Sequence, residues 1–172
     1  MLIAQHTFSF DDQLRFAKFS ADINPIHVDP IAARRSVVGE CIVHGINGLM
    51  IALNALARCT GLTVTSFEAK FIKHISIGLT VNCFWDADKN RLTITNENIL
   101  YTSIIVKVGP SKIKGSLSDL SRGVALNKSK NITIKECSEI GKQQLTYRGD
   151  IDAGKFLFPE LFESYGELIR SE

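Results

Sequence analysis

The chain has 172 residues, 45% of them hydrophobic, and its 20 lysines and arginines nearly balance its 18 aspartates and glutamates. This length suits one ordinary globular core with a tail. The formal charge of +2 at pH 7 gives no global field that would favour nucleic acid or an anionic membrane, so we expect neither among the partners.

The first six residues lack the basic start and the continuous apolar core of a secretory signal. No apolar stretch approaches the roughly 20 residues that a membrane-spanning helix needs, and we expect a cytoplasmic protein. The cysteines and histidines show no spacing typical of a zinc site, so we expect free thiols, no metal and no cofactor. These residues are Cys41, Cys59, Cys83, Cys137, His6, His27, His44 and His74.

The amino-terminal region predicts a strand and two short helices. Phe8 and Phe10 alternate with polar neighbours, which is typical of a short strand, and a capped helix is expected over residues 13–20. That helix places four apolar side chains for partial burial: Leu14, Phe16, Ala17 and Phe19. Asp29 followed by Pro30 predicts a helix N-terminus, with a short helix over residues 31–35.

Residues 46–59 are apolar on almost every face and end at Thr60-Gly61, which predicts a helix buried within the structure. From residue 63 the pattern changes to the alternation and β-branched content of strands. Strands are expected over residues 63–72, 79–86, 91–96 and 99–108, with a hairpin turn at residues 88–90. One buried helix followed by an antiparallel meander is an α+β pattern.

Gly109-Pro110 breaks the pattern and ends a predicted first domain of residues 1–110. Residues 111–136 are rich in lysine, serine and glycine and are interpreted as a basic linker, with one more strand expected at residues 132–134. Residues 137–172 form a tail with apolar residues at irregular intervals. Two interpretations of this tail remain open: the start of a second unit that is absent from the chain, or a segment that docks on a partner subunit.

The residues most informative about function lie between positions 20 and 45. Asp22 and His27 flank an Asn-Pro step, and the proline favours a turn that can bring a carboxylate and an imidazole to a common point, as general acid–base chemistry requires. An ordinary structural turn is the alternative, because Asp and Asn side chains often bond their own backbone. His44-Gly45 then opens the apolar helix.

Residues 16–29, Gly39 and residues 42–45 together resemble the signature of the MaoC-type dehydratases, a family that includes the R-specific enoyl-CoA hydratases. The resemblance covers roughly residues 8 to 109 and implies the hotdog fold, in which a curved antiparallel sheet wraps a long buried helix. Residues 66–78 are similar to a later strand of the family. Here the chain departs from the family pattern, with Lys70-Phe71 for its Arg-Phe pair and Lys73-His74 for its Lys-Pro step.

The resemblance implies catalytic roles for Asp22, His27 and Gly45. Asp22 is expected to act as general base toward a water that His27 orients, and desolvation would raise the pKa of its carboxyl toward the working range. The backbone N–H of Gly45 is expected to stabilise the thioester oxygen, since unpaired amides and the dipole at a helix start favour negative charge. The alternative for Gly45 is that it only lets the chain enter the helix.

Four further residues are predicted to contact substrate, and each has a structural alternative. Asn24 is also a turn former, and His44 is also a local helix cap, which is why it is kept out of the catalytic pair. Asn47 stands where the family commonly has a bulky apolar residue, which suggests an unusual acyl pocket. Lys70 is a candidate for contacting a phosphate of CoA or a carrier pantetheine, although lysines at strand edges are usually solvated.

The predicted function is hydration of an enoyl-thioester, or the reverse dehydration, with an acyl-CoA or acyl-carrier-protein substrate. The first alternative is a non-catalytic hotdog module that binds acyl groups or assembles a larger synthase, and the second is a thioesterase. We expect a homodimer, because many hotdog units pair with the tunnel between them.

Overall fold

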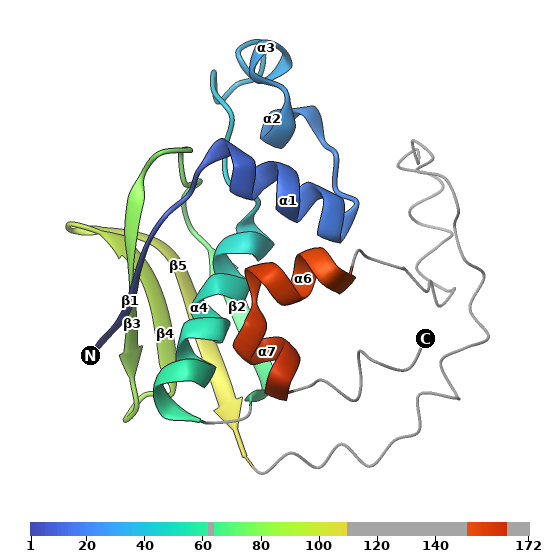
Figure 1. Cartoon of the computed structure of the whole chain (residues 1–172). Helices are drawn as coiled ribbons and strands as arrows, with labels where there is room; N and C mark the ends of the chain where they lie inside the picture. The colour runs from blue at the N-terminus through green and yellow to red at the C-terminus, as the bar shows by residue number, and fades with distance from the viewer. Residues whose placement is uncertain (62–63, 110–150, 165–172) are drawn as a thin grey trace, which may run out of the picture.

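The computed structural model describes residues 1–61, 64–109 and 151–164 (Figure 1). Within them one five-stranded sheet has the order β1-β3-β4-β5-β2, and every neighbouring pair is antiparallel. The linker of residues 111–136, including its expected strand, lies outside this description. The strands are β1 (Leu2–Thr7), β2 (Val64–Phe71), β3 (Thr80–Asp86), β4 (Arg91–Asn96) and β5 (Ile99–Val108).

The central helix α4 (Gly45–Thr60) packs against the sheet, as Figure 1 shows. Leu49, Ala52 and Leu56 are almost completely buried, and Gly48 lies on the same side, where a Cβ would meet apolar side chains of the sheet and of residue 8. The helix ends at Gly61, whose φ of 64° is the left-handed conformation that glycine adopts at helix ends. The predicted α+β architecture is confirmed.

Helix α1 (Phe10–Ser20) begins earlier than expected, because Ser9 and Asp12 form a capping box at its start. The predicted strand at Phe8 and Phe10 is therefore wrong: the strand of this region is β1, and Phe10 is already helical. Leu14, expected to be partly buried, is 45% exposed. The face that α1 buries consists of Gln13, Phe16 and Ala17.

Two single-turn helices follow, α2 (Pro25–Val28) and α3 (Pro30–Ala33). Each has proline at its first position, where the missing N–H costs nothing. Asp29 caps α3, as expected, by accepting from the N–H groups of Ile31 and Ala32. These helices hold the turn region above the N-terminus of α4 (Figure 1).

The tail contributes α6 (Ile151–Leu157), which packs on α1, and α7 (Pro159–Ser164), which packs on α4 (Figure 1). Phe158 is completely buried and packs edge-on against the rings of Phe16 and Phe19 in α1. Asn54 of α4 donates to Glu160 at 2.5 Å and accepts from the N–H of Leu161. The described part of the tail thus packs on its own chain; the division into three segments and the second unit stay predictions.

Candidate active site

Asp22 lies in a tight turn between α1 and α2. Ala21 has a left-handed φ of 51°, and the N–H of Asp22 donates to the hydroxyl of Ser20 at 3.2 Å. Oδ1 of Asp22 accepts the N–H of Asn24 at 3.2 Å, so the residue does make the turn that its sequence context predicts. The side chain is nevertheless 52% exposed, which leaves the carboxylate accessible to a ligand.

His27 lies within α2, and its ring is fixed by the segment that leads into α4. Its Nδ1 is 2.8 Å from the carbonyl oxygen of Ile42, which can only accept, so Nδ1 donates. The N–H of Ile42 in turn donates to the carbonyl of Ile26 at 3.2 Å. In the neutral ring Nε2 therefore carries the lone pair, as a proton acceptor needs.

His44 is the N-cap residue of α4 and is 2% exposed. Its backbone N–H and its Nδ1 both contact Oε1 of Gln13, at 3.1 and 3.0 Å. Its Nε2 lies 3.0 Å from the carbonyl oxygen of Asp22 and 3.9 Å from Oδ2 of the same residue. The ring stacks on that of His27, with centroids 3.9 Å apart and planes inclined by 26°.

The surroundings of His44 act on its charge in opposite directions. Burial lowers the pKa of His44 and is the largest influence, while the hydrogen bond to the Asp22 backbone raises this pKa, His27 lowers it and the Asp22 carboxylate raises it. Both ring nitrogens face oxygen acceptors, an arrangement that only the protonated ring satisfies completely. His44 is therefore a buried imidazole whose hydrogen bonds favour the charged form and whose burial favours the neutral one.

Gly45 is the first residue of α4, where backbone N–H groups have no partner within the helix. A Cβ at this position would lie 3.1 Å from two ring carbons of Phe71, which belongs to β2. The close packing of an aromatic ring thus supplies a structural reason for glycine here. The residue itself remains exposed, so a ligand can approach its amide.

The other predicted contact residues lie in different surroundings. Asn24 is exposed, and its Oδ1 accepts the N–H of Ile26 at 3.2 Å, which is the expected turn role. Asn47 is completely buried, and neither atom of its amide has a partner among the described residues. Lys70 is exposed next to Phe71 on β2 and projects from the opposite face of the sheet, since successive strand residues alternate. The structure does not bring Lys70 to the cluster.

Asp22, His27 and His44 each offer a ligand atom, and these atoms all lie within 4.8 Å of one another. Two hydrogen bonds of about 2.8 Å to one water span roughly 4.6 Å, so atoms this close together are within reach of one shared water. The donor types also suit a metal, but the near-parallel stacked rings direct their in-plane lone pairs along separate planes, and both nitrogens of His44 already face oxygens. The cluster therefore fits a water better than an ion.

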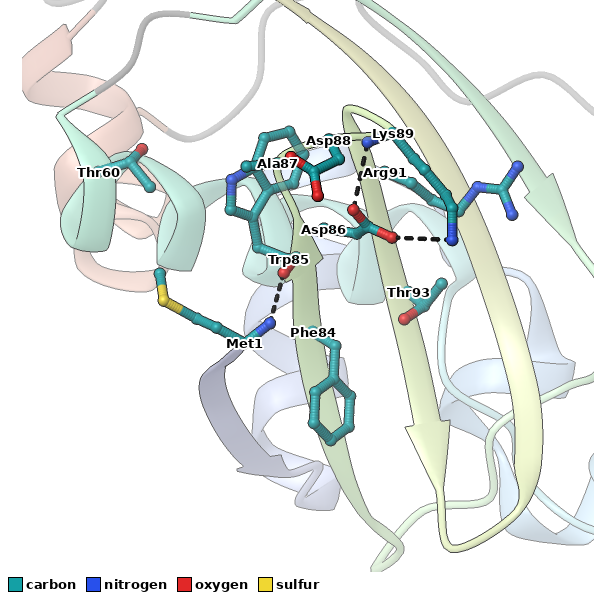
Figure 2. Close-up of a pocket in the computed structure, with 10 residues that line it drawn as sticks. All are labelled: Met1, Thr60, Phe84, Trp85, Asp86, Ala87, Asp88, Lys89, Arg91 and Thr93. Carbon is teal, nitrogen blue, oxygen red and sulfur yellow. Dashed lines mark hydrogen bonds and ion pairs between the residues drawn. The ribbon is translucent and has the colours of Figure 1, made fainter.

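Neither of the two cavities that we describe includes Asp22, His27 or Gly45. One, of about 660 Å³, lies at the β3–β4 hairpin, where Figure 2 shows Trp85 and Asp86. The other, of about 250 Å³, is bounded by β1, α4 and the α6–α7 segment. The acyl tunnel, expected between two paired units, therefore stays a prediction.

The sequence analysis did not identify Gln13 as a site residue and did not predict that Phe71 packs against Gly45. Gln13 is three and four residues before Phe16 and Ala17, so helical spacing alone would have placed it on the buried face. Phe71 was noted only as the aromatic member of the Lys70-Phe71 pair that is compared with the family's Arg-Phe pair. Nothing in the sequence indicated that its ring packs on the start of α4, because that contact joins segments 26 residues apart.

Comparison with known proteins identifies a family for most of the described chain. The model of the MaoC like domain matches residues 3–105, which is more than half of the chain. A search of curated proteins finds no match.

Several solved structures share the fold. An (R)-hydratase from A. caviae involved in PHA biosynthesis is 21% identical, with 60% of this chain and 88% of that chain covered and a TM-score of 0.53. R-hydratase PhaJ1 from Pseudomonas aeruginosa is 23% identical, with coverages of 61% and 76% and a TM-score of 0.50. The ChsH1-ChsH2 complex from Mycobacterium tuberculosis is 11% identical, with coverages of 62% and 91% and a TM-score of 0.53. At these identities the likeness concerns the fold, and the predicted hotdog fold is confirmed.

Proposed function

The chain belongs to the MaoC-like domain family, and from this premise we propose that it is an R-specific enoyl-thioester hydratase or the reverse dehydratase. The observation that carries the proposal is the convergence of Asp22 and His27 beside the N-terminus of α4. The substrate is an acyl-CoA or acyl-carrier-protein thioester with a 2,3 double bond. The chain's own residues supply the acid–base groups, and no cofactor is required.

In hydration, a single water donates one of its hydrogens to the carboxylate of Asp22 and the other hydrogen to the Nε2 lone pair of His27. Its oxygen forms a bond to the β carbon as Asp22 accepts a proton, and the electrons of the double bond move toward the thioester carbonyl. The N–H of Gly45 stabilises the resulting enolate-like oxygen. The proton held by Asp22 then passes to the α carbon, so that H and OH have been added across the double bond.

The half-exposed Asp22 supports a site that a second subunit completes. Ile46 is 50% exposed in the first turn of α4. Phe67 and Phe71, 49% and 47% exposed, lie on β2, which is an edge strand of the sheet formed by the described residues. Exposed apolar side chains on an unpaired edge strand favour association. We therefore propose a homodimer through this edge, and light scattering of the Phe67→Glu variant, expected to be monomeric, tests it.

Asn47 and Lys70 are proposed as substrate contacts on unequal grounds. A buried amide without a partner costs about 1–3 kcal/mol, so Asn47 calls for a polar group of the substrate or an ordered water. Lys70 would reach a phosphate only from the outer face of the sheet. We also propose a cytoplasmic location. As a separate observation, none of the helices in the described part of the chain has the length and apolar composition of a membrane span.

The assay follows crotonyl-CoA with purified protein, recording loss of the conjugated enoyl absorbance and release of free thiol in parallel. The proposal expects the absorbance to fall without thiol release and the product to be the (R)-3-hydroxyacyl thioester. Thiol release with unchanged enoyl absorbance would identify a thioesterase. Binding without either change, on CoA and on carrier-protein substrates, would identify a non-catalytic module.

A further inference from the structure

Gln13 is a buried polar residue of α1 whose amide oxygen accepts hydrogen bonds at the N-terminus of α4. Its Oε1 accepts two hydrogen bonds from His44, one from the backbone N–H and one from Nδ1. The side chain is completely buried beside Phe16, whose ring lies 5.0 Å from that of His44. A polar group held in such a position restricts the ring that it contacts.

The two contacts fix which atom of Gln13 faces His44. A backbone N–H always donates, so the atom that it meets must be the amide oxygen and not the amide nitrogen. The same oxygen then requires a proton on Nδ1 of His44. Gln13 therefore selects the Nδ1-protonated form of His44 and directs Nε2 toward the turn of Asp22.

His44 passes this constraint to both proposed catalytic residues. Its Nε2 lies 3.0 Å from the Asp22 carbonyl, and its ring stacks on His27. The titratable groups that the described residues bring to it are Asp22 and His27; its contacts from α1, Gln13 and Phe16, are uncharged.

We propose that Gln13 and His44 form a positioning relay, in which Gln13 orients His44 and His44 holds the Asp22 turn and the His27 ring in the geometry that binds the water. This inference rests on the proposed function and adds two positioning residues to it. Neither residue has to touch the reacting atoms.

The first test is the Gln13→Met variant, which keeps the length of the side chain and removes the acceptor. NMR of nitrogen-15-labelled histidines reads the ring protonation directly and does not depend on activity. The wild-type protein is expected to show a proton on Nδ1 of His44 throughout its titration, and the variant is expected to lose this preference and to shift the His27 resonances. Gln5→Met, the same substitution at an exposed position of β1, is the matched control.

The second test is the Gln13→Glu variant, which keeps both hydrogen bonds and adds a negative charge beside His44. The relay predicts that the pKa of His44 rises and that Nδ1 stays protonated. With crotonyl-CoA, Gln13→Met is expected to lower kcat at least tenfold with little change in KM, and Gln13→Glu to recover part of that loss. Since glutamate conserves the hydrogen bonds, this variant decides the question if Gln13→Met does not fold.

The relay is overturned if Gln13→Met leaves the histidine resonances and kcat as in the wild type, or if Gln13→Glu leaves the titration of His44 unchanged. An inactive wild-type protein would contradict the proposed function and not the relay, because the NMR measurements still decide whether Gln13 sets the state of His44. Changed histidine resonances with unchanged kcat would also overturn the relay, since the orientation of the His44 ring would then not matter for the reaction.

Discussion

Replacement of Phe158 by alanine tests whether the tail is part of the folded core of its own chain. Phe158 is completely buried, and its ring lies 6.3 Å from that of Phe16 and 5.9 Å from that of Phe19. Removing a buried phenylalanine costs about 3–5 kcal/mol, from lost burial and from the cavity left behind. For a chain of this size each kcal/mol shifts the Tm by about 2–4 °C, so we expect a decrease of about 6–20 °C.

The neighbouring Phe156 supplies the control for this experiment. It is 68% exposed, and the guanidinium of Arg15 lies 4.7 Å from the centroid of its ring. Phe156→Ala should cost no more than about 1 kcal/mol, the typical strength of an exposed cation–π contact. Calorimetry or thermal circular dichroism measures both variants. Equal Tm values for Phe158→Ala, Phe156→Ala and the wild type would refute the packing of the tail on α1 and α4.

Three further predictions concern caps, thiols and pH. Asn24→Ala should cost about 1 kcal/mol of stability through the lost cap of α2 and should lower hydratase activity. Asp29→Ala should cost a similar amount through the lost cap of α3 and leave activity nearly unchanged. Equal activities of the two variants would contradict this prediction. Burial raises the pKa of the Cys83 thiol to about 11. In a Cys137→Ser background, Ellman's reagent at pH 8 should therefore modify the exposed Cys59 readily and Cys83 only after unfolding. Rapid modification of Cys83 in the native protein would be inconsistent with its burial. Burial also lowers the pKa of His6 and of His44 below 6.5, so the unfolded chain binds protons more readily than the folded one. The Tm should therefore fall as the pH decreases below about 6.5. A Tm that rises in this range would contradict the prediction.

Where the sequence predicted structure well, the local pattern and the tertiary environment agree. β4 and β5 have the predicted bounds, because alternating β-branched residues and a hairpin turn specify strands on their own. Asp29 followed by Pro30 specified the start of α3 for the same reason. The central helix extended only one residue beyond its prediction at each end.

Errors arose where the sequence signals of a helix start were read as another element. Phe8 and Phe10 looked like a strand by alternation, but the capping box of Ser9 and Asp12 starts a helix there. His27 was expected on a turn, yet Pro25 sits at the first position of a helix that includes His27. Proline is unfavourable in the interior of a helix but is tolerated in its first turn.

The candidate site was predictable only in part. The pairing of Asp22 with His27 followed from a short segment and from the family resemblance. The contact of Gln13 with His44 joins residues 31 positions apart, and the packing of Phe71 on Gly45 joins two different elements. Such contacts depend on how α1 and β2 meet the start of α4, which no local pattern encodes.

The central claim is that Asp22 and His27 share one water and act on it together. The most direct test is the kcat of crotonyl-CoA hydration for Asp22→Asn and His27→Ala, each with the folded state verified by its Tm. General acid–base groups contribute about 10²- to 10⁴-fold, so we expect losses in that range for each variant, and a double variant little worse than the poorer single one. Single variants that keep wild-type kcat would contradict the account.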